Sequence, residues 1–105
     1  MRILIAGAGA IGSNLAALLA CDLKGEHEIT VLDFDKVEER NLLGTQYYFS
    51  GQEGQFKSEA LEYSLYKHFS KEIDIITEKL TNENISLLSN FDLIVDTFDN
   101  FGLYC

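Results

Sequence analysis

The 105-residue sequence lacks several features that would assign it to common classes of protein. It has only two cysteines, Cys21 and Cys105, and they form no C-x-x-C pair. This excludes a disulfide framework and a cysteine metal site, and it fits a reducing cytoplasm, where we expect the protein to work. No apolar run approaches the ~20 residues of a membrane span, so we expect no membrane partner.

Basic residues are also scarce. The sequence has 8 lysines and arginines against 17 acidic residues, which gives a net charge of −9. This charge repels nucleic-acid phosphates and anionic lipids, so we do not expect nucleic acid as a partner. No repeat, low-complexity tract or linker is visible, and with 47% hydrophobic residues the chain is predicted to form one domain over residues 1–105.

The N-terminal stretch holds the strongest pattern. An apolar run over Ile3–Ala6 predicts a buried strand, and an amphipathic run over Ile11–Leu19 predicts a helix. Between them, Gly7, Gly9 and Gly12 have the spacing G-x-G-x-x-G. The first glycine permits a tight turn, the second lets a phosphate approach the backbone, and the third lets the helix pack close to the sheet. The free N–H groups at the start of the helix then form an anion site.

An acidic residue follows at the expected place. The next strand-like run, Glu28–Asp33, ends at Asp33, roughly 20 residues after the glycine loop. That spacing suits a carboxylate that accepts hydrogen bonds from ribose hydroxyls. Together the loop and Asp33 favour a nucleotide site over a merely structural glycine turn.

A different interpretation of the N-terminus is a bacterial lipoprotein signal that ends at Cys21. Ser13 and Asn14 interrupt its apolar core, and Arg2 is its only basic residue, so this alternative is disfavoured. We expect Cys21 instead to be a small, buried helix residue.

The rest of the chain alternates between helical and strand-like patterns, which predicts a parallel α/β sheet. We expect a Rossmann-like, three-layer fold with helices on both faces, the first strand in a central position, and the chain forming a truncated half of a larger domain. The predicted elements are a helix over Gln52–Phe69, a strand over Ile73–Thr77, a short helix over Asn82–Leu88 with Asn82 as a possible N-cap, and a strand over Phe91–Thr97, while Lys36–Phe49 is irregular or only briefly helical.

Five motifs occur in order along the chain. They are GAGAIGS over Gly7–Ser13, DFDKV over Asp33–Val37, the pair Asn41-Leu42, GQFK over Gly54–Lys57, and DTFDN over Asp96–Asn100. With these motifs the chain resembles the ThiF/MoeB/HesA family of adenylating enzymes, which are related to the ubiquitin-activating enzyme. The resemblance covers nearly all of the 105 residues.

The resemblance implies a reaction and a partner. The reaction is ATP-dependent adenylation of a carboxylate through an acyl-adenylate, with release of pyrophosphate. The carboxylate is usually the C-terminus of a small ubiquitin-like or sulfur-carrier protein. The resemblance also implies ATP and Mg²⁺ as cofactors, and a homodimer for the full-length parent.

The resemblance assigns a role to each matching residue. Backbone N–H groups from Gly9 to Ser13 would bind phosphate oxygens, and Asp33 would bind the ribose. Asn41 and Lys57 would act on the phosphates, and Asp99 would hold Mg²⁺. Taken singly, these residues also suit structural roles: Asp33 as a strand-end acid, Asn41 as a turn former and Lys57 as a solvated lysine. We expect Asp96 to be a strand-end or turn residue.

Two departures from the family pattern leave alternatives open. Gly44 stands where the family usually has an arginine, which Arg40 could replace, and Ala10 stands for the second glycine of the loop. A NAD-dependent dehydrogenase would explain the glycine loop and Asp33, but it leaves Asn41 and the Lys57 motif without a role. A nucleotide-binding module without chemistry would be consistent with Gly44.

Overall fold

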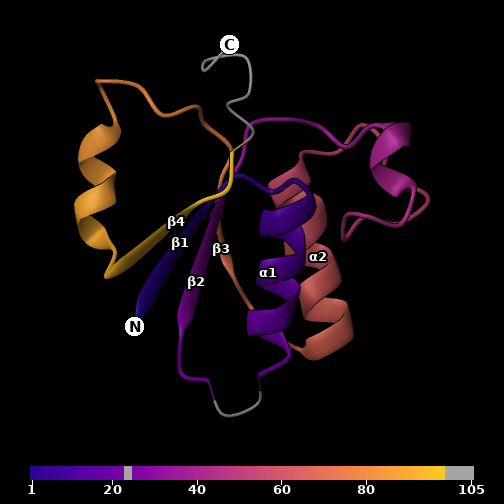
Figure 1. The fold of residues 1–105 in the computed structure, drawn as a ribbon, viewed down its shortest axis with the longest axis horizontal. Helices are drawn as coiled ribbons and strands as arrows, with labels where there is room; N and C mark the ends of the chain where they lie inside the picture. The colour runs from indigo at the N-terminus through magenta and orange to yellow at the C-terminus, as the bar shows by residue number, and fades with distance from the viewer. Residues whose placement is uncertain (23–24, 99–105) are drawn as a thin grey trace.

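A parallel four-stranded sheet forms the centre of the protein (Figure 1). The computed structural model describes residues 1–22 and 25–98 of the chain. The strands lie in the order β3-β2-β1-β4 and are β1 (Arg2–Ala6), β2 (Glu28–Leu32), β3 (Asp74–Ile76) and β4 (Leu93–Asp96). β1 pairs with β2 on one side and with β4 on the other, so the predicted central position of the first strand is confirmed.

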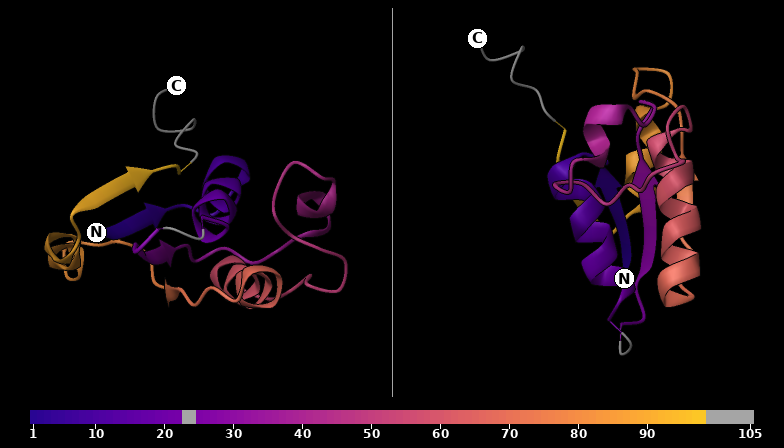
Figure 2. Two further views of the ribbon diagram at one scale, coloured as in Figure 1. Left: turned by 90° about the horizontal axis from the view of Figure 1, so that it is seen from below. Right: turned by 90° about the vertical axis from the view of Figure 1, so that its right-hand side faces the viewer.

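The helices form layers on both sides of this sheet. Two of them, α1 (Ala10–Ala20) and α2 (Lys57–Phe69), lie side by side on one face, and the 3₁₀ helix η2 (Ile85–Asn90) lies on the other side (Figure 2). A further 3₁₀ helix, η1 (Glu39–Leu42), belongs to the long connection between β2 and α2. The strand order runs outward from β1 to β3 and then returns across β1 to β4. Right-handed crossovers therefore place the connections on opposite faces, as the predicted three-layer fold requires.

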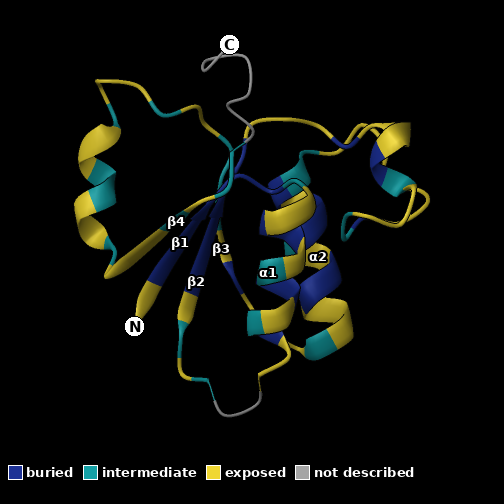
Figure 3. Ribbon diagram, in the orientation of Figure 1, coloured by how far each residue is buried: buried dark blue, intermediate teal, exposed yellow. Residues whose placement is uncertain are grey.

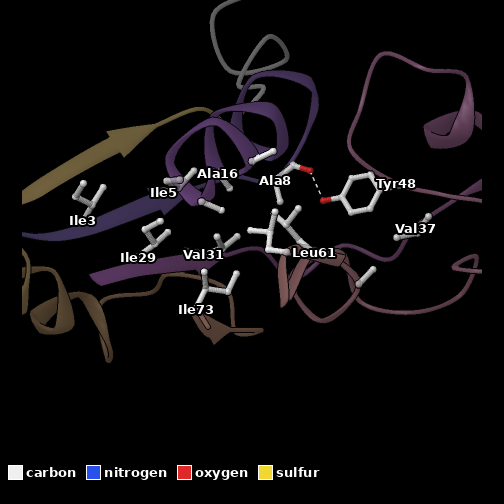
Figure 4. Close-up of a cluster of buried hydrophobic side chains, with 14 residues drawn as sticks. Ile3, Ile5, Ala8, Ala16, Ile29, Val31, Val37, Tyr48, Leu61 and Ile73 are labelled. Atoms are coloured by element: carbon white, nitrogen blue, oxygen red, sulfur yellow. Dashed lines mark hydrogen bonds between the residues drawn. The ribbon is translucent and has the colours of Figure 1, made fainter. Parts of the chain in front are cut away.

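The core lies between the sheet and the two long helices. Alternate residues of β1 and β2 point toward the helices, where small alanines of α1 allow close approach (Figure 4). In Figure 3, β1 and β2 are largely buried while the outer surfaces of α1 and α2 are exposed. The buried cluster includes Ile3, Ile5, Ile29, Val31, Ala16, Ala17, Leu61 and Leu65.

The second long helix begins later than its sequence pattern predicts. α2 starts at Lys57, not at Gln52, because Phe56 has an extended backbone with φ −61° and ψ 139°. Gln52 is buried before the helix, where its side-chain amide donates to the Ser64 hydroxyl at 2.9 Å and its side-chain oxygen accepts from the Phe49 N–H at 2.8 Å. The helical spacing of apolar residues therefore extends into the turn that precedes α2, which is why the sequence pattern places the start of the helix too early.

Two smaller predictions were also wrong. Asn82 is not an N-cap, because η2 begins after Asn84, whose side chain closes the preceding turn by accepting from the Thr81 N–H at 2.7 Å. Cys21 is exposed, because it lies just beyond the last turn of α1, where its thiol donates to the Leu18 carbonyl at 3.2 Å.

Within residues 1–22 and 25–98, no helix is long and apolar enough to cross a membrane.

Candidate functional site

The glycine loop connects β1 to α1 at the carboxyl edge of the sheet. Gly7 has φ +104° and donates its N–H to the Leu32 carbonyl at 2.8 Å, so it makes the tight turn out of β1. A Cβ atom on Gly12 would lie 1.8 Å from the Gly7 carbonyl oxygen and 2.6 Å from the Thr97 hydroxyl. Both glycines therefore have the turn and packing roles that their spacing predicts.

The start of α1 has open backbone donors. Gly9 is the N-cap residue, and no side chain caps the helix. The N–H groups of residues 9–12 have no acceptor among the described residues, and a Cβ atom on Gly9 would meet no described atom within 4 Å. Ser13 differs from the sequence interpretation, because its N–H closes the first helical turn on the Gly9 carbonyl at 3.0 Å. The loop thus offers donors from Gly9 to Gly12 to an anion.

Asp33 joins the end of β2 to this loop. Its side chain is almost fully buried, with 3% exposure. One carboxylate oxygen accepts the Ala8 N–H at 2.7 Å, and the other accepts the Asp35 N–H at 2.7 Å. Asp33 therefore braces the glycine loop in this structure, and the ribose contact stays a prediction.

A short antiparallel contact brings Lys57 to the same edge of the sheet. The Val37 N–H donates to the Gln55 carbonyl at 2.8 Å, and the Gly54 N–H donates to the Val37 carbonyl at 2.9 Å. The Lys57 N–H then donates to the Asp35 carbonyl at 2.9 Å. This pairing explains in physical terms why the motif that starts at Asp33 and the motif that ends at Lys57 belong together. The Lys57 ammonium forms no ion pair or hydrogen bond with the described residues.

Asn41 and Arg40, both in η1, each contact Glu38, the residue before this helix. Asn41 is buried, and its side-chain oxygen accepts the Glu38 N–H at 2.7 Å in a capping box. Arg40 forms an exposed ion pair with Glu38 at 2.7 Å. These contacts support a turn-forming role for Asn41, while a phosphate role of Asn41, or of Arg40 in place of the family arginine, stays a prediction.

Thr97, which directly follows β4, contacts the start of the glycine loop. The Thr97 hydroxyl lies 2.8 Å from the Gly7 carbonyl oxygen and 3.1 Å from that of Ala6. Asp96 accepts the Phe98 N–H at 3.1 Å, so the predicted turn role of Asp96 is confirmed. Asp99 lies outside the described residues. Among residues 1–22 and 25–98, no cluster of three His, Cys, Asp or Glu side chains could hold a metal.

The sequence interpretation missed Tyr48. This residue is 3% exposed, and its hydroxyl donates to the Ala8 carbonyl. Burial, with a further contribution from the nearby Asp33 carboxylate, strongly raises the pKa of Tyr48, so its hydroxyl stays protonated and remains a donor. No sequence signal points to this contact, because Lys36–Phe49 shows no sustained apolar period.

A separate cavity of about 600 Å³ lies away from these residues. It lies between the turn region before α2 and the outer face of α2, and it contains none of the predicted site residues. Its lining includes Phe49, Gln52, Glu59, Glu62, Lys67 and His68.

Comparisons with known proteins show which family model matches this chain and which solved structures share its fold. The model of the ThiF family matches residues 1–103. A search among curated proteins finds no match. Among solved structures, the Escherichia coli tRNA N6-threonylcarbamoyladenosine dehydratase TcdA in complex with ATP has a TM-score of 0.80 and 22% identity, over 94% of this chain and 41% of that chain.

A second E. coli protein, MccB, has TM-scores close to that of TcdA. MccB in complex with MccA-N7isoASN has a TM-score of 0.79 and 25% identity, over 97% of this chain and 30% of that chain. MccB with a succinimide has a TM-score of 0.78 and 27% identity, over 97% of this chain and 31% of that chain. This chain therefore spans less than half the length of each of these structures.

Proposed function

The chain belongs to the ThiF family, and from that premise we propose that it is the nucleotide-binding segment of an enzyme that uses ATP to adenylate a carboxylate. One observation carries the proposal. The open N–H groups of the glycine loop, the Asp33 carboxylate and the backbone of Lys57 lie at one edge of the sheet, connected by the hydrogen bonds of Ala8 and Asp35, and the Lys57 ammonium has no ion-pair partner among the described residues. Ligands of open α/β sheets bind at this edge.

The residues suit the parts of ATP. The N–H groups of Gly9 to Gly12 would bind phosphate oxygens, and the lone pairs that Asp33 does not use would accept from the ribose. Lys57 would place a positive charge where negative charge builds up during attack on the α-phosphate. Support for ATP comes from TcdA, which was solved with ATP and with AMP.

For Mg²⁺ we propose Asp99 as the protein ligand. One or two carboxylates together with phosphate oxygens are typical of magnesium sites, so a larger acidic cluster is not required. The metal would neutralise charge on the triphosphate as the carboxylate approaches.

The acceptor and the assembly are further parts of the proposal. We propose that the carboxylate is the C-terminus of a ubiquitin-like or sulfur-carrier protein. MccB was solved together with MccA and AMPCPP, so a protein of similar fold binds both a second molecule and a nucleotide analogue. We also propose that the full-length protein is a cytoplasmic homodimer, and a single monomeric species in sedimentation would contradict the dimer.

ATP–pyrophosphate exchange tests the reaction. With a ubiquitin-like protein that ends in glycine as the probe, the full-length protein should catalyse exchange. Lys57→Ala and Asp99→Ala should each lower the rate at saturating ATP by about a hundredfold or more, because each removes an electrostatic contact to the reacting phosphates. Lys67→Ala is the matched control, since Lys67 is an exposed lysine on the same helix. Normal exchange in both site variants would contradict the mechanism.

A further inference from the structure

The Ala8 residue of the glycine loop is held at both of its backbone groups by side chains from outside the loop. Asp33 accepts the Ala8 N–H at 2.7 Å. The Tyr48 hydroxyl donates to the Ala8 carbonyl, as the dashed line in Figure 4 shows. All three residues are buried. Two buried hydrogen bonds at one residue leave the peptide groups on either side of it little freedom to rotate.

The carbonyl that Tyr48 contacts belongs to the same peptide unit as the Gly9 N–H. This N–H has no acceptor among the described residues, and the space around the Gly9 Cα is open. A hydrogen bond to the carbonyl of a peptide group polarises the group and makes its N–H a stronger donor. The Tyr48 hydrogen bond is therefore placed where it can both orient and polarise an open donor of the candidate nucleotide site.

The segment that carries Tyr48 is itself attached to the start of α1. We call residues 45–49 the strap. The Thr45 carbonyl accepts from the Asn14 side-chain amide at 2.9 Å, and the Tyr47 N–H donates to the Ser13 hydroxyl at 3.0 Å. These contacts hold the strap against the helix, so the Tyr48 hydroxyl has a fixed position beneath the loop.

We propose that Tyr48 is a positioning residue for nucleotide binding, which orients and polarises the Gly9 N–H through the Ala8 carbonyl. This inference rests on the proposed function, because it takes the phosphates of ATP as the ligand of the glycine loop. It adds a residue outside the glycine, aspartate and lysine motifs to the site.

Two adjacent tyrosines provide a matched test. Tyr48→Phe removes only the hydroxyl that reaches Ala8, while Tyr47→Phe removes a hydroxyl that lies 2.7 Å from the His68 ring on the exposed side. We expect Tyr48→Phe to weaken ATP binding about tenfold in calorimetry and Tyr47→Phe to leave it unchanged. In ¹⁵N-labelled protein, the Gly9 amide signal should shift in Tyr48→Phe only, which a general loss of stability would not produce.

Each outcome decides the matter. ATP binding by Tyr48→Phe equal to that of Tyr47→Phe would overturn the inference. If the unaltered protein does not bind ATP, the proposed function fails, and the Gly9 signal still decides whether Tyr48 acts on the loop. If Tyr48→Phe does not fold, Asn14→Ala removes the amide that donates to the Thr45 carbonyl of the strap, together with its contact to the Ala10 carbonyl, and the Gly9 amide signal then reports whether the loop has changed. Weaker ATP binding than in Tyr47→Phe then supports the inference, and equal binding overturns it.

Discussion

At the scale of single residues, Gly12 and Gly9 of the same loop have opposite surroundings, because a methyl group would collide with backbone atoms at Gly12 but would meet open space at Gly9. On Gly12 a Cβ atom would lie 1.8 Å from the Gly7 carbonyl oxygen, whereas on Gly9 it would meet no described atom within 4 Å. Gly12 is therefore required by the protein itself. The space at Gly9 is available to a ligand.

We predict that Gly12→Ala lowers the free energy of unfolding by about 1–3 kcal/mol or prevents folding, because backbone atoms cannot yield to the new methyl group. Gly9→Ala should lower the unfolding free energy by less, up to about 1 kcal/mol, because alanine is a poorer N-cap residue than glycine. It should weaken ATP binding, because the methyl group would occupy the space through which a phosphate approaches. Urea unfolding and ATP titration measure the two effects. ATP binding by Gly9→Ala at the normal affinity would place the phosphates elsewhere.

The candidate site shows how far single residues could be predicted. Gly7, Gly12 and Asp96 have the structural roles that their positions indicate, because such roles depend on local backbone geometry. Tyr48 could not be predicted, because its contact with Ala8 spans 40 residues and depends on the path of an aperiodic segment.

At the scale of elements, Glu62 of α2 lies near two other acidic side chains, and their repulsion disfavours its negative charge. Burial raises the pKa of Glu62, and Glu59, one turn earlier, and Asp74, at the start of β3, raise it further. A raised carboxyl pKa means that folding disfavours the charged form. The stability that comes from the protonated form is present below the ordinary glutamate pKa and is lost as the pH rises through the folded value.

Glu62→Gln should therefore raise the free energy of unfolding at pH 7, by about 0.2–0.5 kcal/mol for a solvent-screened pair of like charges on a helix. The gain should vanish below about pH 4, where the glutamate is protonated. Urea unfolding at the two pH values measures it, with the exposed Glu83→Gln as control. A gain of equal size at both pH values would show that charge is not the cause.

The elements could be predicted where apolar periodicity and turn residues agree. β1, α1 and β2 lie within one or two residues of their predicted bounds, because a buried strand and an amphipathic helix leave clear patterns. The start of α2 could not be placed, because Phe56 continues the helical spacing of apolar residues although its backbone is extended. The antiparallel pairing of Phe56 with Lys36 holds that extended conformation, and apolar periodicity does not report a contact over such a distance in the sequence.

At the scale of the whole molecule, the candidate site joins segments that are far apart in the sequence. The glycine loop comes from the connection between β1 and α1, Asp33 and the start of α2 come from the two ends of the connection between β2 and α2, and Thr97 directly follows β4. A ligand that contacts these segments together binds only the folded chain. Its binding energy therefore adds to the stability of the entire fold.

ATP with Mg²⁺ should accordingly raise the melting temperature of the chain more than NAD does. At a ligand concentration about a hundred times Kd, binding adds about 2.7 kcal/mol, and each kcal/mol raises the Tm of a domain of this size by roughly 4–8 °C. Thermal unfolding with each nucleotide at the same concentration measures the difference, and Gly9→Ala should lose the shift. An equal or larger shift with NAD would favour the dehydrogenase alternative, because a dinucleotide would then be the better partner for the glycine loop and Asp33.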